Sequence, residues 1–357
     1  MTTLHDVALL RVVAQRLAGP STATPAKAVH WSTAVQAQDH DGALTSVALR
    51  TRTRSRAEVV AALDAGEVVR SWPMRGTLHL TTAADLPWML RLLAPRVVAA
   101  STARRTGLGL DESQLERARG LAVESLSGGR RLRRADLLAV WEDAGLDAGG
   151  QRGVHLLRYL AMTGSLVFGP TAGREQLLVL LDEWVPRPRD PERDEALGEL
   201  ALRYFRSHGP APARDLASWA GLSARDVRTA VAIARPSLAV LDVDGTEHLL
   251  DPHTPDRLAG ARAEAEAEGE GVLLLPGFDE LLLGYRDRRA QLDPAYAERI
   301  VPGGNGVFRP TVVSAGRVVG TWTRTGRGAR QEVAATPFTT FTPGVESAIP
   351  ELYAALP

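Results

Sequence analysis

Two side-chain amides stand two residues apart near the N-terminus, in the run Gln36-Ala37-Gln38. If this run is extended, both amides project to the same side, whereas in a helix they point in nearly opposite directions. Two convergent carbonyl oxygens could hold a water molecule and orient it toward an electrophilic carbon. Neither amide takes a proton at neutral pH, so the pair suits only a reaction with a very good leaving group. Paired glutamines are also common as ordinary surface or cap residues.

A second candidate is the acidic pair Asp279-Glu280, which lies in an apolar stretch of the chain. One of its carboxylates could act as a general base. An equally good account is an internal ion pair with Arg286 or Arg288.

The composition excludes several kinds of chemistry. The chain has no cysteine, which excludes disulfides, thiolate metal sites and a cysteine nucleophile. Lys27 is the single lysine, so a Schiff base would need its amine or the N-terminus. His248 and His253 lie five apart, but no third and fourth metal ligands accompany them. Nucleotide-binding loops and the nucleophile elbow are absent. We therefore predict neither a metal nor a cofactor.

The net charge is zero, but the basic residues are clustered and nearly all are arginine. Arginine suits contact with phosphate because its guanidinium donates two parallel hydrogen bonds. The alternative is a solvated surface paired with nearby acids. The candidate DNA contacts are Arg130, Arg131, Arg133, Arg134, Arg152, His155, Arg158, Arg225, Arg228 and Arg317.

Apolar periodicity predicts elements in a recurring order. In the clearest copy, helices are expected over 194–207, 213–220 and 224–234, followed by a hairpin over 238–250. Asp244-Gly245 is a strong hairpin turn signal. Helix, helix-turn-helix and hairpin is the order of a winged helix. Two looser copies precede it, with hairpins near 68–80 and 165–181.

We therefore predict a helix-rich α+β fold of three tandem winged-helix units and a β-rich C-terminal subdomain. A chain of 357 residues is expected to form two to four compact units. The predicted segments are 1–95, carrying the glutamine pair, then 96–190, 191–254 and 255–357, the last beginning with an acidic helix over 257–270.

The chain lacks an apolar run of membrane-spanning length and an N-terminal stretch resembling a signal peptide. We expect a monomeric cytoplasmic protein at the nucleoid, with no membrane association.

Four blocks of this sequence resemble the winged-helix DNA glycosylases of the AlkZ family, and they follow one another in the family's order. The family's catalytic element is glutamine, an apolar residue, then glutamine or aspartate, and Gln36-Ala37-Gln38 matches its double-glutamine form. Related crosslink glycosylases with a broader substrate range more often have aspartate at the last position. The blocks are 34–39, 72–80, 276–288 and 305–322.

The resemblance implies a monofunctional glycosylase without lyase activity, of a type associated with antibiotic self-resistance. Gln36 and Gln38 would position the water that cleaves the N-glycosidic bond of bulky N7-alkylated purines, including interstrand crosslinks, in double-stranded DNA. The alternative function is a non-catalytic winged-helix DNA-binding or regulatory protein. Against it, the sequence predicts no ligand-sensing domain and no obvious dimerisation helix.

Overall fold

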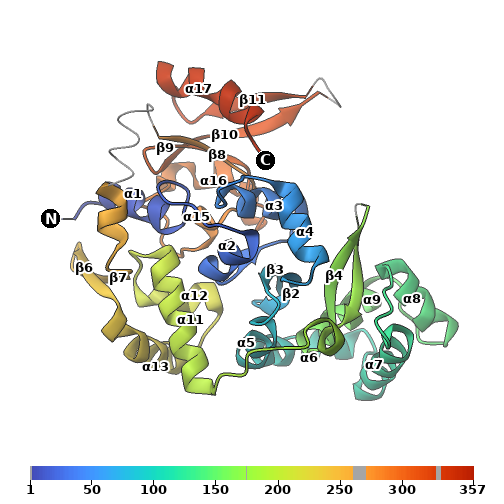
Figure 1. The fold of residues 1–357 in the computed structure, drawn as a ribbon. Helices are drawn as coiled ribbons and strands as arrows, with labels where there is room; N and C mark the ends of the chain where they lie inside the picture. The colour runs from blue at the N-terminus through green and yellow to red at the C-terminus, as the bar shows by residue number, and fades with distance from the viewer. Residues whose placement is uncertain (1, 174, 260–270, 327–330) are drawn as a thin grey trace. The chain divides into compact units, whose positions relative to one another are not determined.

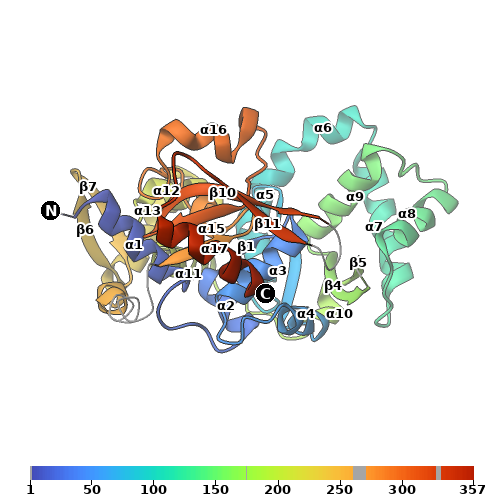
Figure 2. The same cartoon turned by 90° about the horizontal axis from the view of Figure 1, so that it is seen from above.

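A computed structural model describes residues 2–173, 175–259, 271–326 and 331–357 (Figures 1 and 2). The chain forms two compact units. We call residues 1–58 with 197–357 the glutamine unit, because it contains the glutamine pair, and residues 59–196 the central unit. Within the described ranges, no helix has the length and apolarity needed to cross a membrane.

The central unit is built on an antiparallel sheet in the order β3-β2-β4-β5. The first two strands form one hairpin and the last two form another, and α5 packs against β2. The elements are β2 Val68–Met74, β3 Thr77–Thr82, α5 Leu86–Ala100, β4 Leu166–Ala172, β5 Glu175–Leu180 and α10 Leu181–Trp184.

A helical cluster completes the central unit. Figure 2 shows α7, α8 and α9 close to one another, and all three contribute to one apolar core. Trp141 is fully buried in that core, and its indole N–H donates to the carbonyl of Ala118 at 3.1 Å. The helices are α6 Thr102–Gly107, α7 Glu112–Leu126, α8 Arg134–Asp143 and α9 Gln151–Met162.

The glutamine unit combines the N-terminal segment with the C-terminal half of the chain. Asp39 caps α3 by accepting the N–H of Gly42, and this cap ends the extended run that carries the glutamines. Its first elements are α1 Leu4–Ala14, α2 Pro25–Ser32, β1 Val35–Gln36 and α3 His40–Leu49, and α4 Arg56–Asp64 continues into the central unit. The following elements are α11 Arg193–His208, α12 Ala213–Ala220, α13 Ala224–Ala234, β6 Ala239–Val243 and β7 Thr246–Leu250.

The C-terminal part forms an antiparallel sheet in the order β11-β10-β9-β8, against which α17 packs (Figure 1). Trp322 lies in the core between sheet and helix, with Val345 and Ile349. The elements are β8 Val272–Leu275, α15 Glu280–Leu283, α16 Ala297–Ile300, β9 Thr311–Ser314, β10 Arg317–Thr325, β11 Glu332–Pro337 and α17 Pro343–Ala354. Short 3₁₀ turns occur at Arg235–Ser237, Pro294–Tyr296 and Pro302–Gly304.

The predicted mixture of helices and sheets is confirmed, and the hairpins near 68–80, 165–181 and 238–250 are present. In the C-terminal sheet, β9 begins at Thr311, directly after Pro310, which has no N–H to donate to a ladder. The acidic helix expected over 257–270 falls largely outside the described residues. The four consecutive segments and the three tandem winged helices remain predictions.

Two helical glycines in the central unit allow a matched test of its packing. A Cβ at Gly153 would lie 2.6 Å from the backbone oxygen of Ala148, whereas a Cβ at Gly120 would meet nothing within 4 Å. We expect Gly120→Ala to stabilise the protein by about 0.5–1 kcal/mol through helix propensity. Gly153→Ala should destabilise it by about 1–3 kcal/mol, because a backbone atom cannot yield cheaply. Urea unfolding measures both, and equal effects would contradict the packing described for α9.

Candidate active site

The glutamine pair has the extended geometry that its spacing allows. The side-chain Nε2 of Gln36 donates to Oε1 of Gln38 at 3.1 Å, so both amides lie on the same side of the chain. The side chain between them, Ala37, points into the core and is fully buried. Gln36 is 7% exposed, whereas Gln38 is open to solvent. The pair is therefore asymmetric, with one amide held inside and the other at the surface.

Among the residues that the structure describes, none donates a hydrogen bond to one oxygen of the pair. Oε1 of Gln36 is buried and unpartnered. Leaving a buried acceptor unpaired costs about 1–3 kcal/mol. Such an atom is expected where a donor or a positive charge arrives during function.

Glu280 holds the backbone of Gln36. Its Oε1 accepts the main-chain N–H of Gln36 at 3.1 Å. Its Oε2 accepts the indole N–H of Trp219 at 3.1 Å and lies 3.4 Å from Nε2 of His208. Glu280 is 1% exposed, so this carboxylate ties β1 to α11 and α12 inside the core. Sequence reasoning weighed Glu280 only as part of the acidic pair and missed this contact.

Asp279 forms a buried ion pair with Arg50. Both its oxygens accept guanidinium N–H groups at 2.9 Å, and the hydroxyl of Ser46 donates to the same carboxylate. Nη2 of Arg50 also donates to Oε1 of Gln15 at 2.8 Å. Burial by itself would lower the pKa of Arg50, but the facing Asp279 outweighs burial and holds the pKa above its ordinary value.

The alternative considered for the acidic pair was an ion pair with Arg286 or Arg288, whereas the structure pairs Asp279 with Arg50. Arg288 instead donates through Nε to the carbonyl of Leu282 at 2.7 Å. Because both oxygens of Asp279 are engaged and the residue is 5% exposed, its position favours a structural role over that of a general base.

A cavity of about 290 Å³ lies in the glutamine unit, and Asp39, the residue that follows Gln38 in the chain, contributes to its wall. The start of α3, the loop at Pro276–Gly277 and the Trp322 end of β10 also line it. At its edge Asp41 and Arg56 form an ion pair at 2.5 Å. The lining residues include neither Gln36 nor Gln38.

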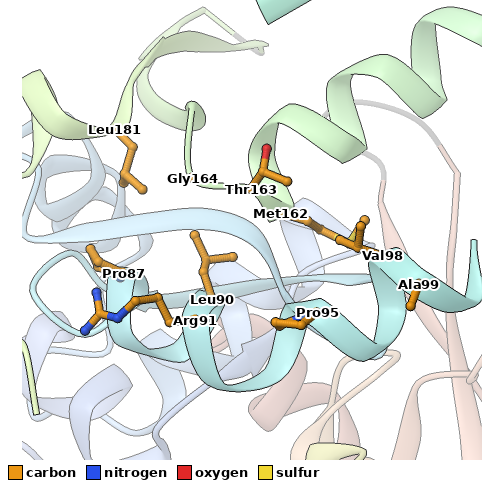
Figure 3. A pocket seen from close by; sticks show the side chains of 10 residues that line it. All are labelled: Pro87, Leu90, Arg91, Pro95, Val98, Ala99, Met162, Thr163, Gly164 and Leu181. Carbon is orange, nitrogen blue, oxygen red and sulfur yellow. The ribbon is translucent and has the colours of Figure 1, made fainter. Parts of the chain in front are cut away.

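A second cavity, of about 600 Å³, lies in the central unit between α5 and the end of α9 (Figure 3). Leu90, Val98 and Met162 supply much of its apolar wall. Its charged lining residue, Arg91, pairs with Asp190. The ten lining residues include neither a carboxylate nor a histidine, so they offer no acid–base chemistry.

The arginines predicted between α7 and α8 are exposed. Several are partly engaged by their own surroundings: Arg130 donates to the carbonyl of Ser127 at 3.0 Å, and Arg133 lies 3.7 Å from Glu175. The guanidinium of Arg131 stacks over Trp184 at 5.2 Å from the ring centroid. Arg134 is the first residue of α8.

The other predicted contacts lie in three places. Arg152, His155 and Arg158 are on α9, and Arg225 and Arg228 are exposed on α13. Arg317 is half-buried at the turn between β9 and β10.

The turn at Arg317 packs closely against α1. A Cβ at Gly316 would come within 2.9 Å of the backbone of Ala8. This contact favours closure of the β-rich subdomain over insertion into a DNA groove. The role of Arg317 stays a prediction.

The sequence and the fold were compared with those of known proteins. A family model described as "DNA glycosylase AlkZ-like" matches residues 29–356. The chain belongs to this family. It is a DNA glycosylase, and the family assignment favours this activity over the alternative of a non-catalytic DNA-binding or regulatory protein.

A relative from Streptomyces sahachiroi, named "Interstrand DNA cross-link repair glycosylase", is 29% identical over 320 residues, covering 85% of this chain and 82% of the relative. The solved structure of Streptomyces sahachiroi DNA glycosylase AlkZ aligns with a TM-score of 0.81 at 25% identity. That alignment covers 99% of this chain and 96% of the AlkZ chain. The similarity therefore extends through both units.

The Asp279–Arg50 pair generates a stability prediction. Asp279→Asn should lower the free energy of unfolding by about 3–5 kcal/mol, because it leaves the guanidinium of Arg50 buried without its counter-charge. Chemical denaturation checks this value. Asp41→Asn, which breaks the pair at the exposed Asp41 side chain, serves as control and should cost less than about 1 kcal/mol. Equal losses in the two variants would contradict the role of the buried pair.

Proposed function

We propose that this glycosylase hydrolyses the N-glycosidic bond of bulky N7-alkylated purines in duplex DNA, including interstrand crosslinks. The inclusion of interstrand crosslinks among the substrates is supported by the family assignment and by the name of the Streptomyces relative. The proposed reaction is monofunctional: water attacks the sugar, and the abasic site is left uncleaved. Double-stranded DNA is the partner.

The observation that carries this proposal is the asymmetric glutamine pair. Gln38 is exposed, so its amide can meet a water molecule above the damaged nucleotide. Gln36 is buried and donates to the carbonyl oxygen of Gln38, which orients the exposed amide. That oxygen retains a second lone pair with which to accept an O–H of water.

The proposed reaction requires little more of the protein than a positioned water molecule and oxygen dipoles near the sugar. An N7-alkylated purine is cationic, so its bond to the sugar is already weakened, and its departure leaves an oxocarbenium-like sugar. Fixed amide oxygens stabilise that developing positive charge without reorganising. Positioning the water makes attack effectively intramolecular.

Removing either amide should slow base release without weakening the binding of DNA. Gln36→Ala and Gln38→Ala are each expected to lower single-turnover base release by ~10²–10³. Affinity for the same duplex should change less than about twofold, because neither side chain is charged. Oligonucleotides carrying one N7-alkylguanine, scored for abasic-site formation, measure the rate.

Two further arms sharpen this experiment. The rate of the parent enzyme should be nearly flat between about pH 6 and 8, since no titrating base is proposed. Gln38→Asp should retain activity and accept additional lesions. Parental rates in both alanine variants would refute the proposed mechanism.

Glu280 is proposed as a positioning residue that acts through the main chain of Gln36. In Glu280→Gln, one carboxylate oxygen becomes an N–H₂ group, so the side chain can no longer accept from both Gln36 and Trp219. Base release at saturating DNA should fall about 10–100-fold, because small displacements at reacting groups are costly.

Asp279→Asn is the matched control for Glu280. It disturbs the adjacent buried carboxylate but leaves the contact from Glu280 to Gln36 in place. At a temperature where both variants are folded, we expect the rate to fall in Glu280→Gln alone. A fall of equal size in the control would reduce Glu280 to a structural residue.

A further inference from the structure

Basic side chains from two helices of the central unit gather where α6 runs beside the start of α9. Arg104 of α6 donates to the side-chain oxygen of Gln151, the first residue of α9. Arg105 lies over the ring of Tyr159 at 5.1 Å from its centroid. Together with His155 and Arg158 of α9, these two arginines form a group that we call the α6–α9 cluster.

Within the described residues, the three arginines of the α6–α9 cluster form no ion pair. Arg105 is only 7% exposed, and it donates to the carbonyl of Val98 at 2.9 Å and to the hydroxyl of Thr102 at 3.1 Å. These partners are neutral, as is Gln151. Guanidinium groups this close to one another normally have carboxylates between them, because like charges repel.

Arg158 is the member with the greatest unmet hydrogen-bonding capacity. Its Nε is buried and has no acceptor. Its Nη2 lies so close to the β2–β3 turn that a Cβ at Gly76 would be 2.0 Å away. Burial, and then the charge of Arg105, lower the pKa of Arg158 below its ordinary value. The surroundings thus disfavour this cation in the free protein, and an arriving anion would relieve that penalty.

We infer that the α6–α9 cluster binds a backbone phosphate of duplex DNA. A phosphodiester supplies the missing negative charge and offers acceptors to the unpartnered Nε of Arg158 and to the exposed Arg104. Arg105 contributes charge from behind, since it is buried. The inference rests on the proposed function only in taking DNA as the source of the phosphate.

Arg152 is excluded from this site by its own partners. It lies on α9 only six residues before Arg158, and it was predicted to contact DNA with the same weight. In the structure its Nε is 3.2 Å from a carboxylate oxygen of Asp147, and its Nη1 donates to the carbonyl of Leu108. Its charge is therefore already compensated, which makes it the matched control.

His155 gives the site a dependence on pH. Burial first, and then Arg158 of its own helix and Arg104 and Arg105 of α6, lower the pKa of His155. Its imidazole is therefore neutral in free protein at pH 7. A bound phosphate offsets those three cations and raises the pKa, so binding takes up a proton. DNA affinity should consequently increase as the pH falls through the pKa of the bound state.

The test measures binding of an undamaged duplex at several salt concentrations. Arg158→Gln and Arg104→Gln should each lower affinity about 5–10-fold at low salt and reduce the slope of log K against log salt by about 1. Arg152→Gln should leave both quantities near the parental values. Equal losses in all three variants, or no loss in Arg158→Gln, would overturn the inference.

A second arm compares pH 7.5 with pH 5.5. The parent should bind more tightly at the lower pH, and His155→Gln should lack most of this gain. An identical gain in both proteins would remove His155 from the site. Because the duplex is undamaged, these outcomes are independent of base release. Failure of the proposed mechanism would appear instead in the glutamine variants, whose affinity is expected to stay parental.

Discussion

A buried charge is costly unless it is paired or hydrogen-bonded, and in the glutamine unit the adjacent acids Asp279 and Glu280 meet this requirement in different ways. Asp279 neutralises Arg50, and Glu280 accepts N–H groups from Gln36 and Trp219. The dipeptide Asp279-Glu280 thereby holds Gln36 and Arg50, which lie more than two hundred residues earlier in the chain. The position of the amide pair is a consequence of this arrangement, since β1 itself contributes only two residues.

Local patterns carried much of the prediction. The two-residue spacing of the glutamines required only an extended backbone to bring them together, and Asp244-Gly245 forms the expected hairpin turn with both residues at positive φ. Long-range pairing was out of reach, because nothing near Asp279 in the chain indicates Arg50 as its partner. The helix α5 was also missed, since Pro95 lies in its interior, where proline normally argues against a helix.

In this protein, the arginines that cluster in the sequence are not the ones that come together in the fold without acidic partners. Arg130 to Arg134 form the densest run in the chain, yet Arg130, Arg131 and Arg133 make separate contacts with a carbonyl, an aromatic ring and a carboxylate. Arg105 and Arg158 are separated in the chain by helices α7 and α8, yet the charge of Arg105 lowers the pKa of Arg158. A run of arginines in the sequence therefore indicates a basic surface. Whether arginines from different helices come together without carboxylates between them depends on how the helices pack.

The hold of Glu280 on position 36 is made to a peptide N–H, a group that every residue except proline provides. This contact therefore anchors the backbone at position 36 whatever side chain the residue carries. The side chain at position 36 can therefore be exchanged without loss of this backbone contact, and the solvent-facing side chain at position 38 is less constrained still.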